Sequence, residues 1–274
     1  MIYFLTLSIA LCALLFPFPS SAEQIQGERQ VKEIIPMILK MPEEKFLTDT
    51  YYEYSWVHIG PREIVWRALT NRFAYLVEGL ECPYVEITNY ERAGIKDYVL
   101  NMGGTVKSGD SYLNGEIGFG GDNINYVYRF QAFLEYTRKA FGYLYWKTGW
   151  HYLHYNPNDV FIFSPGLTYY YGDHCFSVGY NAAYTQDRGT AHSGVTTMNF
   201  ALTKKLNLTF GAAVGERLYD IYVLSPSKQY GYILYNRFTV HLTKNSGVGV
   251  GYSYSKENPD FYKRSADLNF FVRF

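Results

Sequence analysis

Few residues of this chain are placed so that they could share a catalytic site. His192 and Ser193 form the one adjacent His-Ser pair, and nucleophilic catalysis needs a nucleophile within hydrogen-bond reach of a base. Ser193 begins a predicted strand, Ser193–Thr203, and successive residues of a strand point to opposite faces, so the two side chains cannot easily share one site. The other histidines show no metal-ligand spacing, and no glycine-rich phosphate loop joins a strand to a helix. The sequence therefore predicts no catalytic residue, no metal site and no cofactor.

Ionisable residues instead recur at every second position of stretches whose other positions are apolar. In one such stretch, Lys147 and His151 alternate with Trp150 and other large apolar residues. Alternate residues of a strand share a face, so these ions would gather on one surface with those of neighbouring strands. Such a surface can form a constriction that selects solutes, or a solvated wall whose charges balance one another. The candidates for this inner surface are Glu116, Arg129, Glu135, Lys147, Arg237 and Asp267.

The element that shows this alternation best is the last stretch, Tyr262–Phe274, which ends on an aromatic residue. Its period of two predicts a strand with one apolar and one polar face. The pattern resembles the last strand of bacterial outer-membrane barrels, which commonly ends in Phe and is read by the barrel-assembly machinery. The resemblance implies that machinery as a partner, with Phe270, Val272 and Phe274 as the assembly signal.

The composition suits strands better than a helical bundle. Of 274 residues, 19% are aromatic, 29 are Tyr and 24 are Gly. An excess of Tyr and Gly is typical of barrel strands that alternate a lipid-facing ring with a small inward-facing residue. The 25 basic residues equal the 25 acidic ones, so the charge gives no reason to expect nucleic acid as a partner.

Strands and turns follow one another from residue 51 onward. Strands are predicted at Ser111–Gly120, Tyr126–Thr137, Asp159–Tyr171 and His174–Thr185, with a loop at Gln186–Ala191. We expect about fourteen strands, with about twelve or sixteen as alternatives, because the alternation before residue 96 is unclear. Short turns between successive strands predict an all-β fold, a transmembrane antiparallel up-and-down β-barrel.

The membrane location follows from where the large rings fall. After the first 22 residues no run is long and apolar enough for a transmembrane helix, so a membrane protein would have to be a closed barrel. A soluble lipocalin-like barrel, with its apolar row inside, is the alternative. Rings near strand ends, such as Trp150, Tyr184 and Tyr254, favour outer-membrane lipid around the barrel, since aromatic girdles mark both membrane interfaces.

The first 22 residues are predicted as a secretory signal peptide. Residues 2–16 are apolar, and the predicted cleavage follows Ala22. The segment lacks the usual Lys or Arg before the apolar run, and an N-terminal membrane anchor is the alternative. Residues 23–49 are predicted as a periplasmic segment, either a tether or a plug, and residues 50–274 as the barrel. Whether Cys82 and Cys175 pair is left open.

The chain also resembles the YaiO-type outer-membrane proteins. The resemblance rests on Ser164–Leu167 leading to Tyr169–Gly172, on the turn of Gly215, Glu216 and Arg217, and on the closing run from Tyr230 to Phe274. It extends more loosely to Tyr126–Phe133 and to Asn89–Gly94, where the family shows a more basic run, and so covers residues 50–274. Members are outer-membrane barrels, some linked to exopolysaccharide export, and the resemblance implies no established reaction. It marks the 215–217 turn as one that fixes a loop or contacts a ligand.

Three function classes follow. The first is a channel or export component for a hydrophilic solute, with a saccharide as one candidate, that uses the polar inner face as its conduit. The second is a closed barrel with a structural or interaction role and no transport. The third, an outer-membrane enzyme, lacks a catalytic constellation in this sequence.

Overall fold

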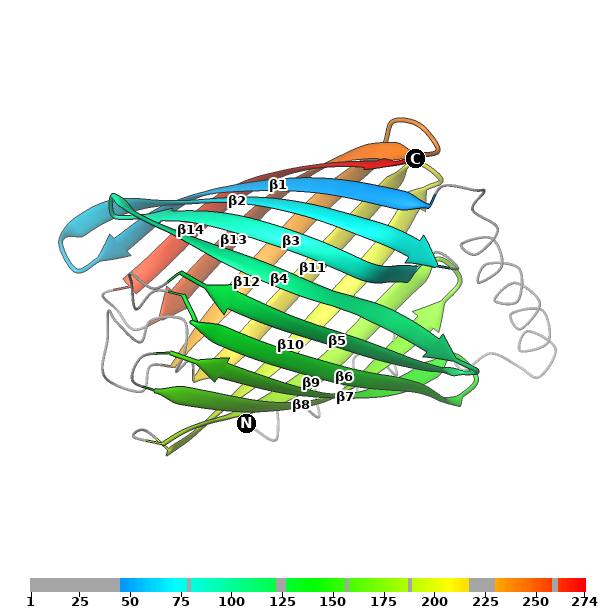
Figure 1. The fold of residues 1–274 in the computed structure, drawn as a ribbon, viewed down its shortest axis with the longest axis horizontal. Helices are drawn as coiled ribbons and strands as arrows, with labels where there is room; N and C mark the ends of the chain where they lie inside the picture. The colour runs from blue at the N-terminus through cyan, green and yellow to red at the C-terminus, as the bar shows by residue number, and fades with distance from the viewer. Residues whose placement is uncertain are drawn as a thin grey trace. The chain divides into compact units, whose positions relative to one another are not determined.

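The chain folds into a closed barrel of fourteen antiparallel β-strands. The computed structural model describes residues 45–77, 80–121, 127–155, 158–186, 189–216, 230–257 and 261–274. Each strand pairs with its neighbours in the sequence, and β14 pairs with β1 to close the wall (Figure 1). The strands are β1 (Phe46–Ile59), β2 (Arg62–Val77), β3 (Leu80–Arg92), β4 (Ile95–Ser108), β5 (Ser111–Gly120), β6 (Phe130–Phe141), β7 (Leu144–His154), β8 (Asp159–Tyr171), β9 (His174–Thr185), β10 (Gly189–Thr203), β11 (Leu206–Glu216), β12 (Tyr230–His241), β13 (Ser246–Glu257) and β14 (Phe261–Arg273).

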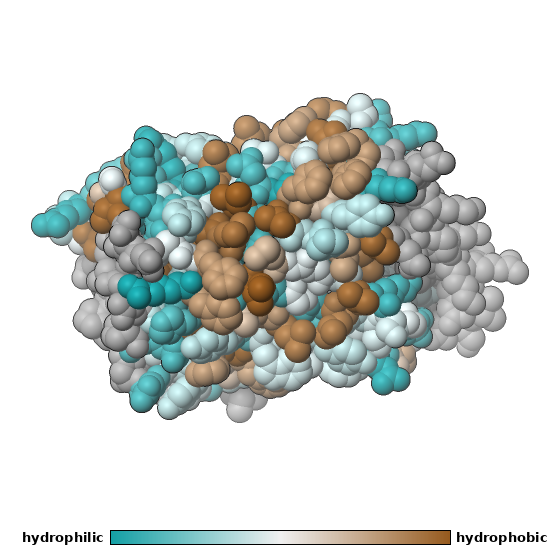
Figure 2. Space-filling model, in the orientation of Figure 1, coloured by the Kyte–Doolittle hydropathy of each residue, from teal (hydrophilic) through white to brown (hydrophobic). Residues whose placement is uncertain are grey.

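Alternation decides which side chains face outward. In β13, Val250 and Tyr252 are exposed on the outer face, while Gly251 between them faces inward. The same holds around the wall, where most exposed large apolar residues occupy one row of each strand and the exceptions, such as Ile95 and Tyr170, lie at strand ends. Figure 2 shows these apolar side chains gathered over the middle of one face, with hydrophilic residues toward both ends. Among the described residues, no helix is long and apolar enough to cross a membrane.

The barrel closes through the two terminal strands. The backbone N–H of Phe46 donates to the carbonyl of Phe274 over 2.9 Å, and the N–H of Phe274 donates back over 3.0 Å. The two rings stack with centroids 5.8 Å apart, and the Phe73 ring lies 5.6 Å from that of Phe46. Closure pairs the edges that an open sheet would leave unpaired.

The two ends of the barrel differ in their connections. Strands joined at the end that holds Phe274 are linked by two residues, except for four between β12 and β13. At the other end the connections reach nine residues between β5 and β6 and thirteen between β11 and β12. We call these the turn end and the loop end. In outer-membrane barrels short turns face the periplasm and longer loops face outward.

The predicted fold is confirmed, and the strand count is fourteen. Ser111–Gly120, Asp159–Tyr171 and His174–Thr185 are strands with the predicted bounds. The prediction was wrong where loops meet strands. β6 begins at Phe130 rather than at residue 126, and β10 begins at Gly189, inside the predicted loop 186–191.

Local contacts explain these differences. Arg129 is held by backbone bonds to Gly120 and His154, but residues 127–129 form no strand pairs. Gly189 has φ of 73°, a conformation that glycine adopts freely, which lets Thr190 pair at once with Tyr184. At the N-terminal side β1 begins at Phe46, so residues 46–49 belong to the barrel. The predicted signal peptide and residues 23–44 lie outside the described residues.

Candidate functional site: the charged lumen

The inner face of the barrel is identified by contacts between strands that are not neighbours. The Arg237 guanidinium on β12 lies 5.1 Å from the ring centroid of Tyr51 on β1, with β13 and β14 between them. Tyr84 on β3 donates a hydrogen bond to Glu116 on β5, across β4. Such side chains meet only on the concave side of a wall. The residues in register with them therefore face the lumen.

One group of lumen charges centres on Arg72 of β2. Its guanidinium lies 2.6 Å from the Glu86 carboxylate and 3.0 Å from that of Glu81. It also lies 4.5 Å from the ring centroid of Tyr84. Asn101 Nδ2 donates to Glu86 over 3.2 Å. The fork of the guanidinium lets one cation hold two carboxylates, which a lysine could do less well.

Glu116 extends this group along the wall through neutral partners. It accepts hydrogen bonds from Tyr84 and from Gln131 Nε2, and Gln131 Oε1 lies 2.9 Å from His151 Nε2. The ionic cluster on β2 and β3 thus continues to β7 as a hydrogen-bonded chain. A carboxylate held only by neutral donors keeps its charge available to a passing cation.

A second group lies across the β14–β1 closure. Lys263 Nζ is 2.9 Å from Glu53, and the hydroxyls of Ser55 and Ser265 lie 2.9 Å apart. Both serines are buried. These contacts join the first and last strands from the inside, so they stabilise the closure as well as line the lumen.

Arg237 and Asp267 form the third pair, with 2.9 Å between Nη2 and Oδ1. The Asp267 side chain is only 10% exposed, and the strand between them carries Gly251 at this level. A Cβ at Gly251 would lie 2.2 Å from Asp267 Oδ2. Glycine is therefore needed here so that the carboxylate can reach across β13 to the guanidinium. Glu135 and Lys147 pair more loosely, at 3.5 Å.

Carboxylates outnumber cations in these groups. Seven carboxylates face four cations if Asp49, which accepts a hydrogen bond from Asn269, is included. The carboxylates are Asp49, Glu53, Glu81, Glu86, Glu116, Glu135 and Asp267, and the cations are Arg72, Lys147, Arg237 and Lys263. The acidic excess is local to these groups, because the same inward rows carry further cations toward the two ends of the barrel, such as Arg92 over the Trp66 ring and Lys107 over the Tyr112 ring. Within the groups, the excess of fixed acidic charge attracts cations.

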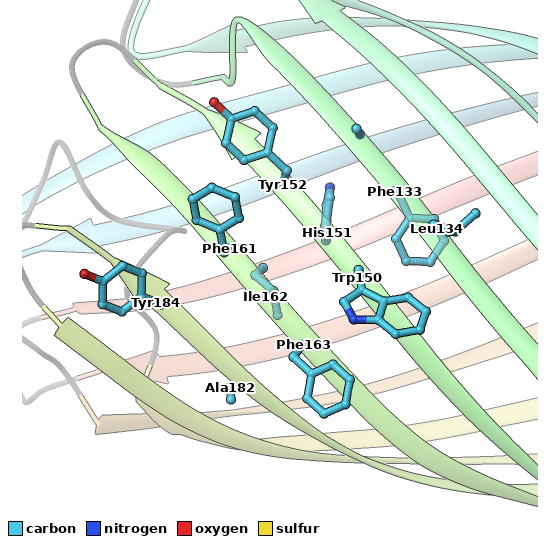
Figure 3. Close-up of a pocket in the computed structure, with 11 residues that line it drawn as sticks. Phe133, Leu134, Trp150, His151, Tyr152, Phe161, Ile162, Phe163, Ala182 and Tyr184 are labelled. Atoms are coloured by element: carbon cyan, nitrogen blue, oxygen red, sulfur yellow. The ribbon is translucent and has the colours of Figure 1, made fainter.

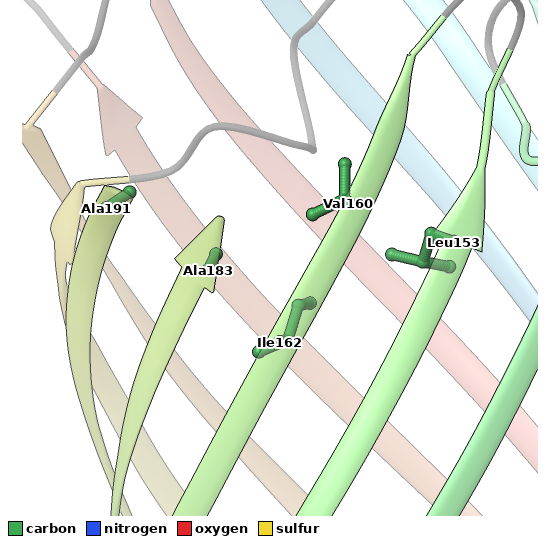
Figure 4. Packing of buried hydrophobic residues seen from close by; sticks show 5 residues of the cluster. All are labelled: Leu153, Val160, Ile162, Ala183 and Ala191. Atoms are coloured by element: carbon green, nitrogen blue, oxygen red, sulfur yellow. The ribbon is translucent and has the colours of Figure 1, made fainter. Parts of the chain in front are cut away.

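The loop end of the lumen is narrowed by packed side chains. Tyr128, from the β5–β6 connection, donates its hydroxyl hydrogen to Asn101 over 2.9 Å. Beside it lies an apolar cluster of inward residues on β7–β10 (Figure 4). Its members are Leu153, Val160, Ile162, Ala183 and Ala191, and Tyr128 and Tyr155 pack against them. At the turn end the Tyr170 side chain, which shares the inward row of β8, is 41% exposed.

The predicted candidates fall in this lumen with one exception. Glu116, Glu135, Lys147, Arg237 and Asp267 face inward and make the contacts given above. Arg129 precedes β6, and among the described residues its contacts are the backbone bonds already given.

The three residues of the turn suggested by the family resemblance do not form one inward-facing site. Gly215 has φ of 147° and packs against Ser193, Glu216 ends β11 on the outer row, and Arg217 lies outside the described residues. Phe270, Val272 and Phe274 occupy the outer row of the closing strand.

Sequence reasoning missed Arg72, Glu86, Glu53 and Lys263. The alternation of β2 and β3 is unclear because both strands also carry polar residues on the outer row, such as Asn71. A usable signal did exist, since Glu53 alternates with the outward Tyr52 and Tyr54 in β1.

The part of the chain that the structure describes offers neither a metal-binding group nor a His-Ser pair on one face. No group of three His, Cys, Asp or Glu residues there could hold a metal ion. His192 and Ser193 point to opposite faces: the His192 ring bonds Tyr180 outside, while Ser193 accepts a bond from Asn181 inside. Cys82 on β3 and Cys175 on β9 are both free thiols, on strands far apart around the wall.

Comparison with known proteins shows which solved structures share this fold. No family model matches the sequence, and no curated protein matches it. Among solved structures, Omp33, an outer membrane protein of Acinetobacter baumannii, superposes with a TM-score of 0.54 at 11% identity, over 85% of this chain and 99% of that one. The fold is that of outer-membrane β-barrels.

Two further structures support this assignment. An outer membrane channel from Pseudomonas putida F1 gives a TM-score of 0.53 at 8% identity, over 85% of this chain and 97% of that one. A bacterial polysaccharide outer membrane secretin gives 0.52 at 10% identity, over 83% and 98%. At these identities the likeness concerns the fold alone.

Proposed function

We propose that this chain is an outer-membrane channel or export component for hydrophilic solutes. The observation that carries the proposal is the lumen itself, whose inward rows hold ion pairs and amide and hydroxyl groups between small apolar clusters near the two ends of the barrel. A soluble barrel would bury its apolar row, whereas here that row is outside. The outer-membrane location fits both this inversion and the likeness to outer-membrane barrels.

Three parts of the chain take roles in this proposal. The first 22 residues act as the signal peptide, and the residues between it and β1 form a periplasmic tether or plug. The barrel-assembly machinery reads the outer row of β14 that ends in Phe270, Val272 and Phe274. The closure contacts of Phe274 support its role, because the residue that ends the assembly signal also completes the wall.

A saccharide is the finer proposal for the solute, and membership of the YaiO-type proteins the finer proposal for the family. Most of the lumen charges are already paired, so an uncharged solute would meet mainly hydroxyl and amide groups, such as Thr168 and Ser177, whose oxygens lie 2.7 Å apart. Those groups can exchange hydrogen bonds with a polyhydroxylated solute.

A closed barrel without transport is the second candidate. It is favoured by the hydrogen bond from Tyr128 to Asn101 and by the apolar cluster beside it, which narrow the loop end. In this reading the barrel serves structure or interaction.

Ion conductance across a planar lipid bilayer distinguishes the two. Protein from residue 23 onward, refolded in detergent, is expected to give discrete conductance steps. Tyr128→Ala should enlarge them, because it removes both the hydrogen bond and the ring at the loop end. The matched control is Tyr252→Ala on the outer face, which should leave them unchanged. Stable insertion of all three proteins without conductance would favour the closed barrel.

A further inference from the structure

The outer face carries a groove over β6–β9 that interrupts the apolar belt. Its volume is about 430 Å³, and two outward rows of residues line it across the four strands, together with Phe133, His151 and Ile162, the residues that lie between the two rows on β6, β7 and β8 (Figure 3). The register gives the first row as Ala132, Tyr152, Phe161 and Tyr184, and the second as Leu134, Trp150, Phe163 and Ala182. Each row contains three large side chains and one alanine, with the alanines at opposite corners.

The hollow exists because of these alanines. Most other exposed positions of the belt hold Leu, Val, Ile or aromatic residues, which fill the outer surface. The ring pairs in the groove are close, with centroids 4.8 Å apart for Tyr152 and Phe161 and 6.0 Å for Trp150 and Phe163. Rings fixed by such contacts present a preformed apolar surface, so little side-chain entropy is lost when a ligand packs against them.

A polar rim borders the groove toward the loop end. Tyr152 Oη donates to Asp159 Oδ1 over 2.9 Å, and His154 Nδ1 lies 2.7 Å from the same oxygen. The groove therefore has an apolar floor within the membrane belt and hydrogen-bonding groups at one end. A membrane lipid has the same two-part chemistry, with an apolar chain and a polar headgroup.

The strand ladder beside the groove is weakened at one point. β8 and β9 pair on both sides of Ser164 and Pro165 in the same register, but these two residues form no pairs with Asn181 and Tyr180. Proline has no N–H to donate, which removes one ladder bond. Among the described ladders, this one alone is interrupted in mid-strand without a register shift. Phe163 and Ala182 are the last paired residues before the gap. Fewer backbone hydrogen bonds must therefore break if β8 and β9 separate slightly there and widen the groove.

We propose that this groove binds one acyl chain of a membrane lipid, seated against Trp150 and Phe163 with the headgroup at the Tyr152–Asp159 rim. The groove lies within the apolar belt, and in the membrane that belt is covered by lipid. An acyl chain in the bilayer is already surrounded by hydrocarbon, so its retention depends on van der Waals contact, and a chain that fills the hollow touches more fixed side-chain atoms than one lying on the flat belt. The site rests on the membrane location and is independent of whether the lumen conducts.

Native mass spectrometry of the full refolded chain tests this. The protein is released from nanodiscs of one defined phosphatidylethanolamine, and retained lipids are counted. We expect one firmly retained lipid, with retention at least tenfold lower in Ala182→Phe and in Ala132→Leu, which fill the two corners. The matched control is Ala212→Phe on the outer row of β11, which should retain the lipid like the unmodified chain.

The outcomes separate clearly. Equal retention in the corner variants and the control, or loss of every lipid from the unmodified chain, would overturn the proposal. Heat-modifiable migration on gels shows whether each variant has folded. If Ala182→Phe fails to fold, Ala132→Leu, which adds fewer atoms, carries the test. A conductance failure would leave this result unaffected, so the two proposals fail separately.

Discussion

Replacing Arg237 with Gln is expected to shift the ion selectivity of the lumen toward cations. The substitution leaves the Asp267 carboxylate without its counter-ion while keeping a side chain of similar length. An ion passing about 5 Å from one uncompensated charge in water feels about 0.8 kcal/mol, and screening at 0.1 M salt reduces this to about 0.5 kcal/mol. That energy enriches cations about twofold and depletes anions about twofold. The cation-to-anion permeability ratio should therefore rise about fivefold.

The assay is the reversal potential of single channels under a potassium chloride gradient. Asp267→Asn should shift it in the opposite direction, because it leaves the guanidinium uncompensated, and the double variant should return close to the unmodified protein. Arg264→Gln is the matched control. It removes the same charge from the outer row of β14, the strand that carries Asp267. A conducting Arg237→Gln variant whose permeability ratio stays unchanged would refute the assignment of this pair to the conduction path.

Three further outcomes are expected. Deleting Phe274, or replacing it with Asp, should reduce the amount of heat-modifiable protein in the outer membrane, because the ring and backbone contacts with Phe46 close the barrel; normal assembly would contradict this. Gly211→Ala should destabilise the barrel in urea by about 1–2 kcal/mol, because the new Cβ would meet the Tyr235 ring 1.9 Å away, whereas Gly249→Ala, with 3.4 Å of room, should have little effect. Raising salt from about 0.1 M to about 1 M should largely abolish the selectivity change caused by Arg237→Gln as the Debye length falls from about 10 Å to about 3 Å, and a salt-independent change would exclude the uncompensated Asp267 charge as its cause.

Much of the fold could be predicted because a barrel strand repeats every two residues. β5, β8 and β9 have the predicted bounds, since glycine and aspartate mark their turns and each strand alternates without interruption. The starts of β6 and β10 could not be predicted, because they depend on backbone bonds to residues that are distant in sequence. His154, which bonds Arg129, is one example.

The lumen could be predicted only in part. Alternation selected Glu116, Lys147 and Asp267 as inward residues, and the structure places them there. It gave no means of pairing them, because a partner depends on the strand register and on the curvature of the wall. Arg237 reaches Asp267 only because Gly251 leaves space on the strand between them.

The sequence by itself determined that this chain forms amphipathic strands joined by short turns, with rings on one face and polar residues on the other. That follows from local sterics and periodicity, which act within each strand. Only the tertiary structure decided which charges meet, where Tyr128 narrows the loop end, and that Ala132 and Ala182 share a groove on the outside. The physical reason is closure: residues far apart in sequence become neighbours only when β14 pairs with β1 and fixes the register of the whole wall.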